Sequence, residues 1–123
     1  MFGRKKKAQP AEFIPKAGGC VCTKSVLAGE TPLRWCFREE SINPADNGWR
    51  FIGRDDDEEY INVPGNNAVV DFNTVANIEP AVLLIYDMPA GTDVWLECGK
   101  DGGMRFYHSG SGEELVFDRR GGV

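Results

Sequence analysis

The side chains of this chain that could do chemistry form two groups, a set of thiols with a single histidine and a run of carboxylates. The first group has the residue types of a zinc site, and its members are Cys20, Cys22, Cys36, Cys98 and His108. Its Cys-x-Cys spacing is too short for the common zinc knuckles, whose paired cysteines are separated by two or more residues. We therefore predict that the thiols are small apolar fillers, and that the chain has neither a dedicated metal site nor a cofactor.

Nucleophilic catalysis would require a base beside a serine or a cysteine, and His108 is the single histidine of the sequence. The sequence contains no G-x-S-x-G elbow, no glycine-rich phosphate loop after a strand and no H-E-x-x-H motif. We therefore predict no catalytic residue, and we expect a binding protein rather than an enzyme.

The second group is Asp55–Glu59, a run of consecutive carboxylates. Like charges this close stay in water, pair with cations or hold a metal, because an unpaired buried carboxylate is strongly destabilising. An EF-hand loop does not fit, since it needs spaced oxygen ligands and a glycine at its sixth position. A weak divalent-cation site is one interpretation of the run, and a recognition patch for a basic partner is another. The third is a solvated loop, neutralised in part by Arg34, Arg38, Arg50 and Arg54.

A short aromatic strand leads into the carboxylates. Trp49 and Phe51 lie on one side of it and Arg50 and Ile52 on the other, which is the period of two expected for a strand with one buried face. Other strand patterns occupy residues 20–27, 33–39, 92–98 and 104–109, and residues 68–72 are either a short apolar strand or the approach to a helix. Pro80 divides the one helical segment into residues 73–78 and 80–86, with Asp71 or Asn73 as the first N-cap.

These elements predict an α+β fold, a mostly antiparallel sheet of about six strands with one short two-piece helical segment packed on it. Two hairpins are expected, one pairing residues 20–27 with 33–39 and the other pairing residues 92–98 with 104–109. In the first hairpin the alternation predicts a core face of Leu33, Trp35 and Phe37, opposite a basic face of Arg34, Cys36 and Arg38. A last short strand is expected at residues 115–117.

The charge of the chain is uneven. The formal net charge is −5 over 123 residues, but four of the fourteen basic residues lie in Arg4–Lys7, so residues 8–123 carry −9. An acidic body argues against nucleic acid as a partner and favours a basic protein. No stretch approaches the roughly 18 apolar residues of a membrane span, and the first ten residues lack the apolar core of a signal peptide. We expect a cytoplasmic protein with no stable membrane association.

By length the chain is a single domain. We divide it into a basic flexible lead-in (residues 1–18), one α+β domain (residues 19–118) and a flexible tail (residues 119–123). The sequence gives no indication of the oligomeric state.

A string of motifs in this chain resembles the bacterial family known as immunity protein 33-like. In order, the motifs are GGCVCTKSV, RWCFREE, DNGWRF, DDDEEY followed by Asn62, FNTVANIEP and DMPAGTDVWLE. They cover about residues 18–97, with conservative departures at Phe72-Asn73-Thr74, where the family has Leu-Asn-Thr, and at Glu79-Pro80, where it has Asp-Pro. The resemblance implies an immunity protein of a polymorphic toxin system, which neutralises a cognate toxin by protein–protein contact, and it supplies no catalytic residue.

Carried onto this sequence, the recurring family positions are Arg38, Glu39, Glu40, Gly48, Trp49, Arg50, Phe51, Asp57, Glu58, Glu59, Tyr60, Asn62, Asn73 and Thr74. The expected structural set is Gly48, Trp49, Arg50, Phe51, Tyr60, Asn73 and Thr74. The expected partner-binding set is Glu39, Glu40, Asp57, Glu58, Glu59 and Asn62, with Asp55 and Asp56 added from the carboxylate run. The alternative hypothesis is a small enzyme or ligand-binding domain with a carboxylate/arginine pocket, which a concave site holding Glu39, Arg50, Asp57 and Tyr60 would favour.

Overall fold

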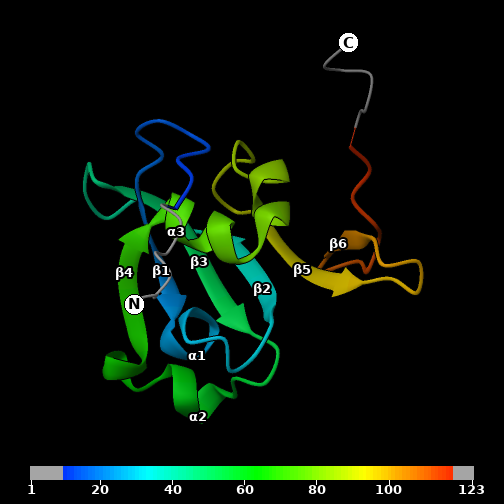
Figure 1. Cartoon of the computed structure of the whole chain (residues 1–123), viewed down its shortest axis with the longest axis horizontal. Coiled ribbons are helices and arrows are strands. Elements are labelled where there is room, and N and C mark those ends of the chain that lie inside the picture. Colours follow the sequence, from blue (N-terminus) through cyan, green and yellow to red (C-terminus); the bar gives the residue numbers. More distant parts are fainter. Residues whose placement is uncertain (1–9, 118–123) are drawn as a thin grey trace, which may run out of the picture.

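Six strands form one sheet in the order β4-β1-β3-β2-β5-β6 in the computed structural model, which describes residues 10–117. Figure 1 shows β4 at one side of this sheet and the β5–β6 hairpin at the other. The strands are β1 (Gly19–Thr23), β2 (Leu33–Arg38), β3 (Asp46–Gly53), β4 (Asn67–Asp71), β5 (Asp93–Cys98) and β6 (Met104–His108). The helices are α1 (Lys24–Leu27), α2 (Glu58–Ile61) and α3 (Phe72–Ile78), with 3-10 turns η1 (Pro64–Asn66) and η2 (Pro80–Leu84). The predicted α+β fold with a mostly antiparallel six-stranded sheet is confirmed.

The core lies between one face of the sheet and the two-piece helical segment. Asp71 caps α3 by accepting a hydrogen bond from the backbone N–H of Asn73 at 2.8 Å, and Pro80 begins η2, where its missing N–H is not needed. Phe72 of α3 contacts the ring of Phe51 at 5.8 Å between centroids, which joins the helix to the sheet. The two helical pieces therefore form where the sequence predicts them, with η2 ending two residues earlier.

The first predicted hairpin is wrong. β1 pairs in parallel with β3 and antiparallel with β4, and β2 pairs with β3 and β5. The strand pattern of residues 20–27 ends at Thr23, because Lys24–Leu27 folds into α1. That helical turn packs Val26 above β3, where Gly53 leaves room for it, so the chain emerges on the far side of β3. The second predicted hairpin, β5–β6, is confirmed.

The predicted core face of β2 is confirmed for Leu33 and wrong for Trp35 and Phe37. Cys36 is fully buried, whereas Trp35 is 38% exposed and Phe37 is half-buried. The pairing of β2 with β3 contains an irregularity between Leu33 and Trp35, which changes the alternation of side chains. Leu33 and Cys36 thus both face the core, and Trp35 and Phe37 face the opposite side.

The ends of the predicted domain are only partly described. Arg4–Lys7 and residues 119–123 lie outside the described residues, so the division into lead-in, domain and tail stays a prediction. In the described part of the lead-in, Ile14 exchanges two hydrogen bonds with the Asn73 side chain, at 3.0 and 2.9 Å. Near the other end, Glu114 forms a single bridge with Tyr107 rather than a strand at residues 115–117. Among the described residues, no helix is long and apolar enough to cross a membrane.

Candidate functional site

The face of the sheet opposite the core, named here the open face, is the face that α1, α3 and η2 leave uncovered in the described chain. Paired residues cross it in two rows. The first row is Val69, Val21, Arg50 and Phe37, and the second is Ile52, Trp35, Trp95 and Tyr107. In the second row the Trp95 ring lies 4.5 Å from that of Tyr107 and 6.4 Å from that of Trp35 between centroids. The open face is therefore aromatic over β2, β5 and β6.

Arg50 is the charged centre of the open face. Its guanidinium forms a bidentate pair with Asp46, at 2.9 and 3.0 Å, and its Nε donates to Oε1 of Glu39 at 3.0 Å. The side chains of Arg50 and Asp46 are each 10% exposed, whereas that of Glu39 is 57% exposed. The hydrogen bonds from Arg50 hold the pKa of Asp46 well below its usual range, against the opposing effect of burial. The group carries a net charge of −1, most accessible at Glu39.

Gly48 brings these three residues together. Its φ of +90° lies in the left-handed region, and a Cβ at this position would overlap the carbonyl oxygen of Glu39. Without that Cβ the two backbones approach closely enough for the Glu39 N–H to donate to the Gly48 carbonyl at 2.8 Å. The structural role expected for Gly48 thus has a physical reason, which is to place Glu39 beside Arg50.

A hollow of about 220 Å³, named here the Arg50 hollow, lies beside this group. Its walls come from β1, β2, β3, the start of β4 at Asn67 and the end of α2, and they include Phe37, Glu39, Arg50 and Asn62. Oε2 of Glu39 accepts no hydrogen bond from the described residues, and four of the five guanidinium N–H groups of Arg50 are already used. The hollow is therefore better suited to a cationic or hydrogen-bond-donating group than to an anion.

The carboxylate run does not act as one unit. Asp56 accepts hydrogen bonds from the hydroxyls of Thr23 and Ser25, at 2.7 and 2.5 Å, and from the Gly53 N–H at 2.7 Å. Asp57 caps α2, accepting from the Tyr60 N–H at 2.8 Å. These two carboxylates hold the chain in place after β3.

The other three carboxylates of the run face solvent. Asp55 pairs with Arg54 at 3.0 Å, and this hydrogen bond lowers the pKa of Asp55. Glu58 and Glu59 lie exposed in the first turn of α2, without an ion pair to any described residue. Of the arginines expected to neutralise the run, Arg54 alone contacts it within residues 10–117.

The remaining predicted positions are spread over the molecule. Trp49 and Phe51 are buried in the core, Asn73 is buried beneath the described lead-in, and Thr74 is exposed on α3. Glu40 is exposed next to Glu39. The structure therefore brings Glu39, Arg50 and Asn62 into one hollow, whereas Asp57 and Tyr60 do not line it. The assignment of partner-binding residues stays a prediction.

Asp46 is the site residue that sequence reasoning missed, because its neighbours in SINPADN indicate a loop. Asp46 and Arg50 are four residues apart, which is about 13 Å in a regular strand, so alternation alone does not predict their pairing. The irregular pairing of β1 with β3 and the positive φ of Gly48 bring the two side chains together.

Three of the four thiols are core fillers, as predicted, because Cys20, Cys22 and Cys36 are buried. The prediction is wrong for Cys98, which is exposed at the end of β5. Burial raises the pKa of all three buried thiols, that of Cys22 to about 12, so they are neutral at ordinary pH. Within residues 10–117, no group of three or more His, Cys, Asp or Glu side chains is placed to hold a metal ion.

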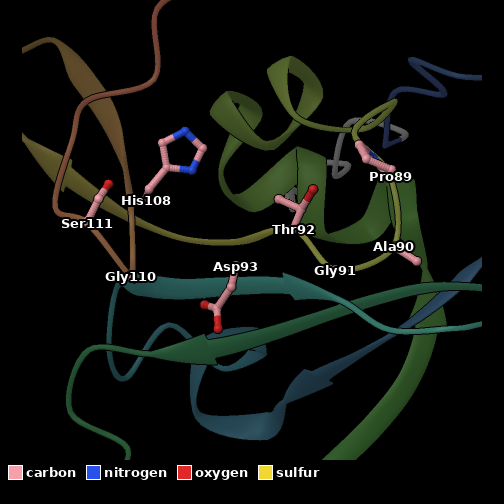
Figure 2. Close-up of a pocket in the computed structure, with 8 residues that line it drawn as sticks. All are labelled: Pro89, Ala90, Gly91, Thr92, Asp93, His108, Gly110 and Ser111. Atoms are coloured by element: carbon pink, nitrogen blue, oxygen red, sulfur yellow. The ribbon is translucent and has the colours of Figure 1, made fainter.

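A second, wider depression lies between the β5–β6 hairpin and the turn before β5. It has a volume of about 560 Å³, and its lining includes Asp93, His108 and Ser111, the residue types of a nucleophilic relay. Figure 2 shows the His108 ring directed away from Asp93. Asp93 instead accepts from the Ser109 hydroxyl at 2.8 Å, and no hydrogen bond joins His108 to Asp93 or Ser111. This arrangement does not form a nucleophile–base pair.

The fold and site define a small α+β protein whose sheet is covered on one face. The other face, the open face, has a charged hollow beside a row of aromatic rings that are wholly or partly exposed. A family model described as the Immunity protein Imm33 domain matches residues 20–108, and the chain belongs to this family. The resemblance to the immunity protein 33-like family is thereby confirmed. Membership supports an immunity function and implies a cognate toxin as the binding partner. Comparisons with curated proteins and with solved structures gave no match.

Proposed function

We propose that this protein is a cytoplasmic immunity protein of a polymorphic toxin system, which neutralises a basic cognate toxin by covering part of its surface. The observation that carries the proposal is the Arg50 hollow, lined by the accessible carboxylate of Glu39 and by the end of α2, in a chain of the immunity family. Glu39 forms part of its wall, and α2, which carries Glu58 and Glu59, ends at the same wall with Ile61 and Asn62. We call Glu39, Glu58 and Glu59 the acidic margin.

The acidic margin suits a lysine or arginine side chain of the toxin. The accessible oxygen of Glu39 can accept a charge-assisted hydrogen bond, and Phe37 and Ile52 offer apolar contact to the methylene groups of such a side chain. The net negative charge of the body would also attract a basic surface at long range, which raises the association rate and makes it depend on salt. Glu40, Asp55, Asp56, Asp57 and Asn62 remain part of the proposed contact surface.

The test neutralises carboxylates of the run that are not needed for the fold. A variant with Asp55→Asn, Glu58→Gln and Glu59→Gln neutralises the exposed members of the run and retains Asp56 and Asp57. The control variant carries Glu30→Gln, Asp87→Asn and Glu113→Gln, which neutralise exposed carboxylates on other parts of the chain and give the same net charge.

The partner for this test is the toxin encoded by a neighbouring gene, or the protein captured by a pull-down from the native cytoplasm. We expect the first variant to associate roughly tenfold or more slowly at low salt, with the difference shrinking at high salt, while the control stays close to the wild-type protein. Equal association rates for the two variants, with both folded, would show that the run does not contact the toxin.

A small-ligand-binding role is the second candidate, because the Arg50 hollow is concave and brings Glu39, Arg50 and Asn62 together. It is the less favoured one, since Asp57 and Tyr60 lie outside the lining and few donors of Arg50 are free. Binding of free arginine or agmatine, measured by calorimetry and abolished by Glu39→Gln, together with toxin association that Glu39→Gln leaves unchanged, would support this role over the first.

A further inference from the structure

The two edge strands of the sheet, β6 and β4, differ in whether described residues pair with their outer side. At the β6 edge, Glu114 bridges to Tyr107, and the Leu115 N–H donates to the Phe106 carbonyl at 2.8 Å. At the β4 edge, no described residue forms a second strand pair. β4 has no lysine, proline or bulge to protect this edge, and its one charged residue is Asp71 at its end.

The hydrogen-bond pattern shows which backbone groups of β4 point outward. The Phe72 N–H donates to the Gly18 carbonyl at 2.9 Å, next to the pair of Gly19 with Asp71. Because hydrogen-bonded and non-hydrogen-bonded pairs alternate along an antiparallel ladder, the residues of β4 bonded to β1 are Ala68 and Val70. The N–H and C=O groups of Asn67, Val69 and Asp71 therefore point away from the sheet.

Val69 lies at the centre of this edge, and its side chain is 80% exposed on the open face. Beside it is a hollow of about 360 Å³, whose lining is largely apolar and includes Val21, Ile42 and Ala45. Ile42 is itself 77% exposed. An unpaired strand edge thus adjoins an uncovered apolar surface, the combination that strand pairing would bury.

We propose that β4 pairs antiparallel with β4 of a second copy of this chain, about a two-fold axis at Val69. In this register Val69 lies opposite its own copy, and each Asn67 lies opposite the Asp71 of the other chain. The outward N–H and C=O groups of both strands are then all paired, in six hydrogen bonds. The sheet becomes continuous across the axis, with the open faces on the same side and the two apolar hollows adjacent.

Electrostatic repulsion between the two Asp71 carboxylates favours the register centred on Val69 over the register centred on Asp71. The two Asp71 carboxylates are offset by four residues along the paired strands, about 14 Å at the rise of a β-strand, which exceeds the Debye length of about 8 Å at physiological ionic strength. A shift that centres the axis on Asp71 would place these carboxylates opposite one another, which is destabilising. The Asp46 carboxylate near the hollow is already paired with Arg50.

The proposal does not depend on the proposed immunity function. The Glu39 side of the Arg50 hollow is formed by β2 and β3, away from the β4 edge, so each copy keeps this wall accessible. A dimer could therefore present two such sites.

The first test is the mass of the full chain in solution, by sedimentation velocity over a range of concentrations. We expect a reversible change from the 13.6 kDa chain to twice that mass. Val69→Lys introduces a like charge opposite its own copy and is expected to weaken dimerisation by roughly tenfold or more. Val116→Lys is the matched control, because Val116 is 90% exposed outside the strands, and it should leave the dimer unchanged.

A cross-link tests the register itself. Residues opposite one another in a hydrogen-bonded pair have Cα atoms about 5.5 Å apart, which is within the range of a disulfide. In a Cys98→Ser background, Val69→Cys is expected to give a covalent dimer on mild oxidation, and Val116→Cys to give little. Monomer mass at every concentration, or a dimer that Val69→Lys leaves intact, would overturn the proposal. The proposal would also be overturned if the backbone N–H groups of β4 were protected from hydrogen exchange solely when a different protein is bound.

Discussion

The ion pair beneath the open face gives the sharpest prediction. Replacing Asp46 by asparagine keeps the size of the side chain but removes its charge. In the native protein this carboxylate accepts two hydrogen bonds from Arg50 and one each from the backbone N–H groups of Ile42 and Gly48. The NH2 group of the new asparagine would face an N–H donor. The Arg50 side chain, which is 10% exposed, would keep Glu39 as its single charged partner. At roughly 1.5–3 kcal/mol for each charge-assisted bond lost, Asp46→Asn should lower the free energy of unfolding by about 3 kcal/mol.

Urea unfolding followed by tryptophan fluorescence measures this loss, because Trp49, the residue before Arg50, is buried in the native protein and becomes exposed on unfolding. Asp101→Asn is the matched control, since Asp101 and Arg105 form the same i,i+4 pair on the surface, and we expect little change there. Because the pKa of Asp46 is lowered by folding, its stabilisation is present above the unfolded pKa of about 3.9 and is lost as the pH falls below it. The difference between wild type and Asp46→Asn should therefore be constant from about pH 5 to 7 and narrow in stronger acid.

Two results would refute this reasoning. One is a loss for Asp46→Asn no larger than that for Asp101→Asn, since the buried pair would then contribute no more than an exposed one. The other is a difference that does not narrow below about pH 4, because the effect would then not come from the charge. A double variant with Arg50→Met should lose less than the sum of the two single losses, as expected for two groups that contact each other directly.

Three further predictions concern the turns and the thiols. Gly48→Ala should destabilise by about 2 kcal/mol or more in urea unfolding, and Gly29→Ala, at a similar φ but in open space, by about 1 kcal/mol; equal losses would contradict the close approach at Gly48. Asp56→Ala leaves two hydroxyls and a backbone N–H without their acceptor, so it should lose about 2–4 kcal/mol, whereas Glu58→Ala should change stability little. A thiol reagent should label Cys98 rapidly in the native protein and the other cysteines on unfolding, and fast labelling of a second thiol would contradict the burial.

The sequence was informative wherever one local signal decided the structure. Trp49 and Phe51 alternate with Arg50 and Ile52 and are buried, and Pro80 divides the helical segment as its missing N–H requires. Val94 and Leu96 likewise alternate with exposed neighbours in a hairpin closed by a short turn.

The errors arose where tertiary contacts overrode the local pattern. Lys24–Leu27 has residues suited to a strand, but burying Val26 against the space above Gly53 favours a helical turn. That turn leads β2 to the far side of β3, and a parallel neighbour for β1 cannot be read from spacing alone. In β2 the irregularity after Leu33 changes the alternation, and no glycine or proline lies within residues 33–35 to mark it.

The candidate site was predicted by residue type but not by grouping. The carboxylates of Asp55–Glu59 have adjacent positions and different roles: Asp56 joins the chain to β1 and α1, Asp57 caps α2, and Asp55 pairs with Arg54. Replacing all five at once would remove the hydrogen bonds of Asp56 and the cap of Asp57, a combined loss of several kcal/mol in a protein of this size. Lost toxin binding in that variant would reflect unfolding as readily as lost contact. Neutralising the exposed carboxylates alone separates the two effects, and it makes the run a test of recognition rather than of stability.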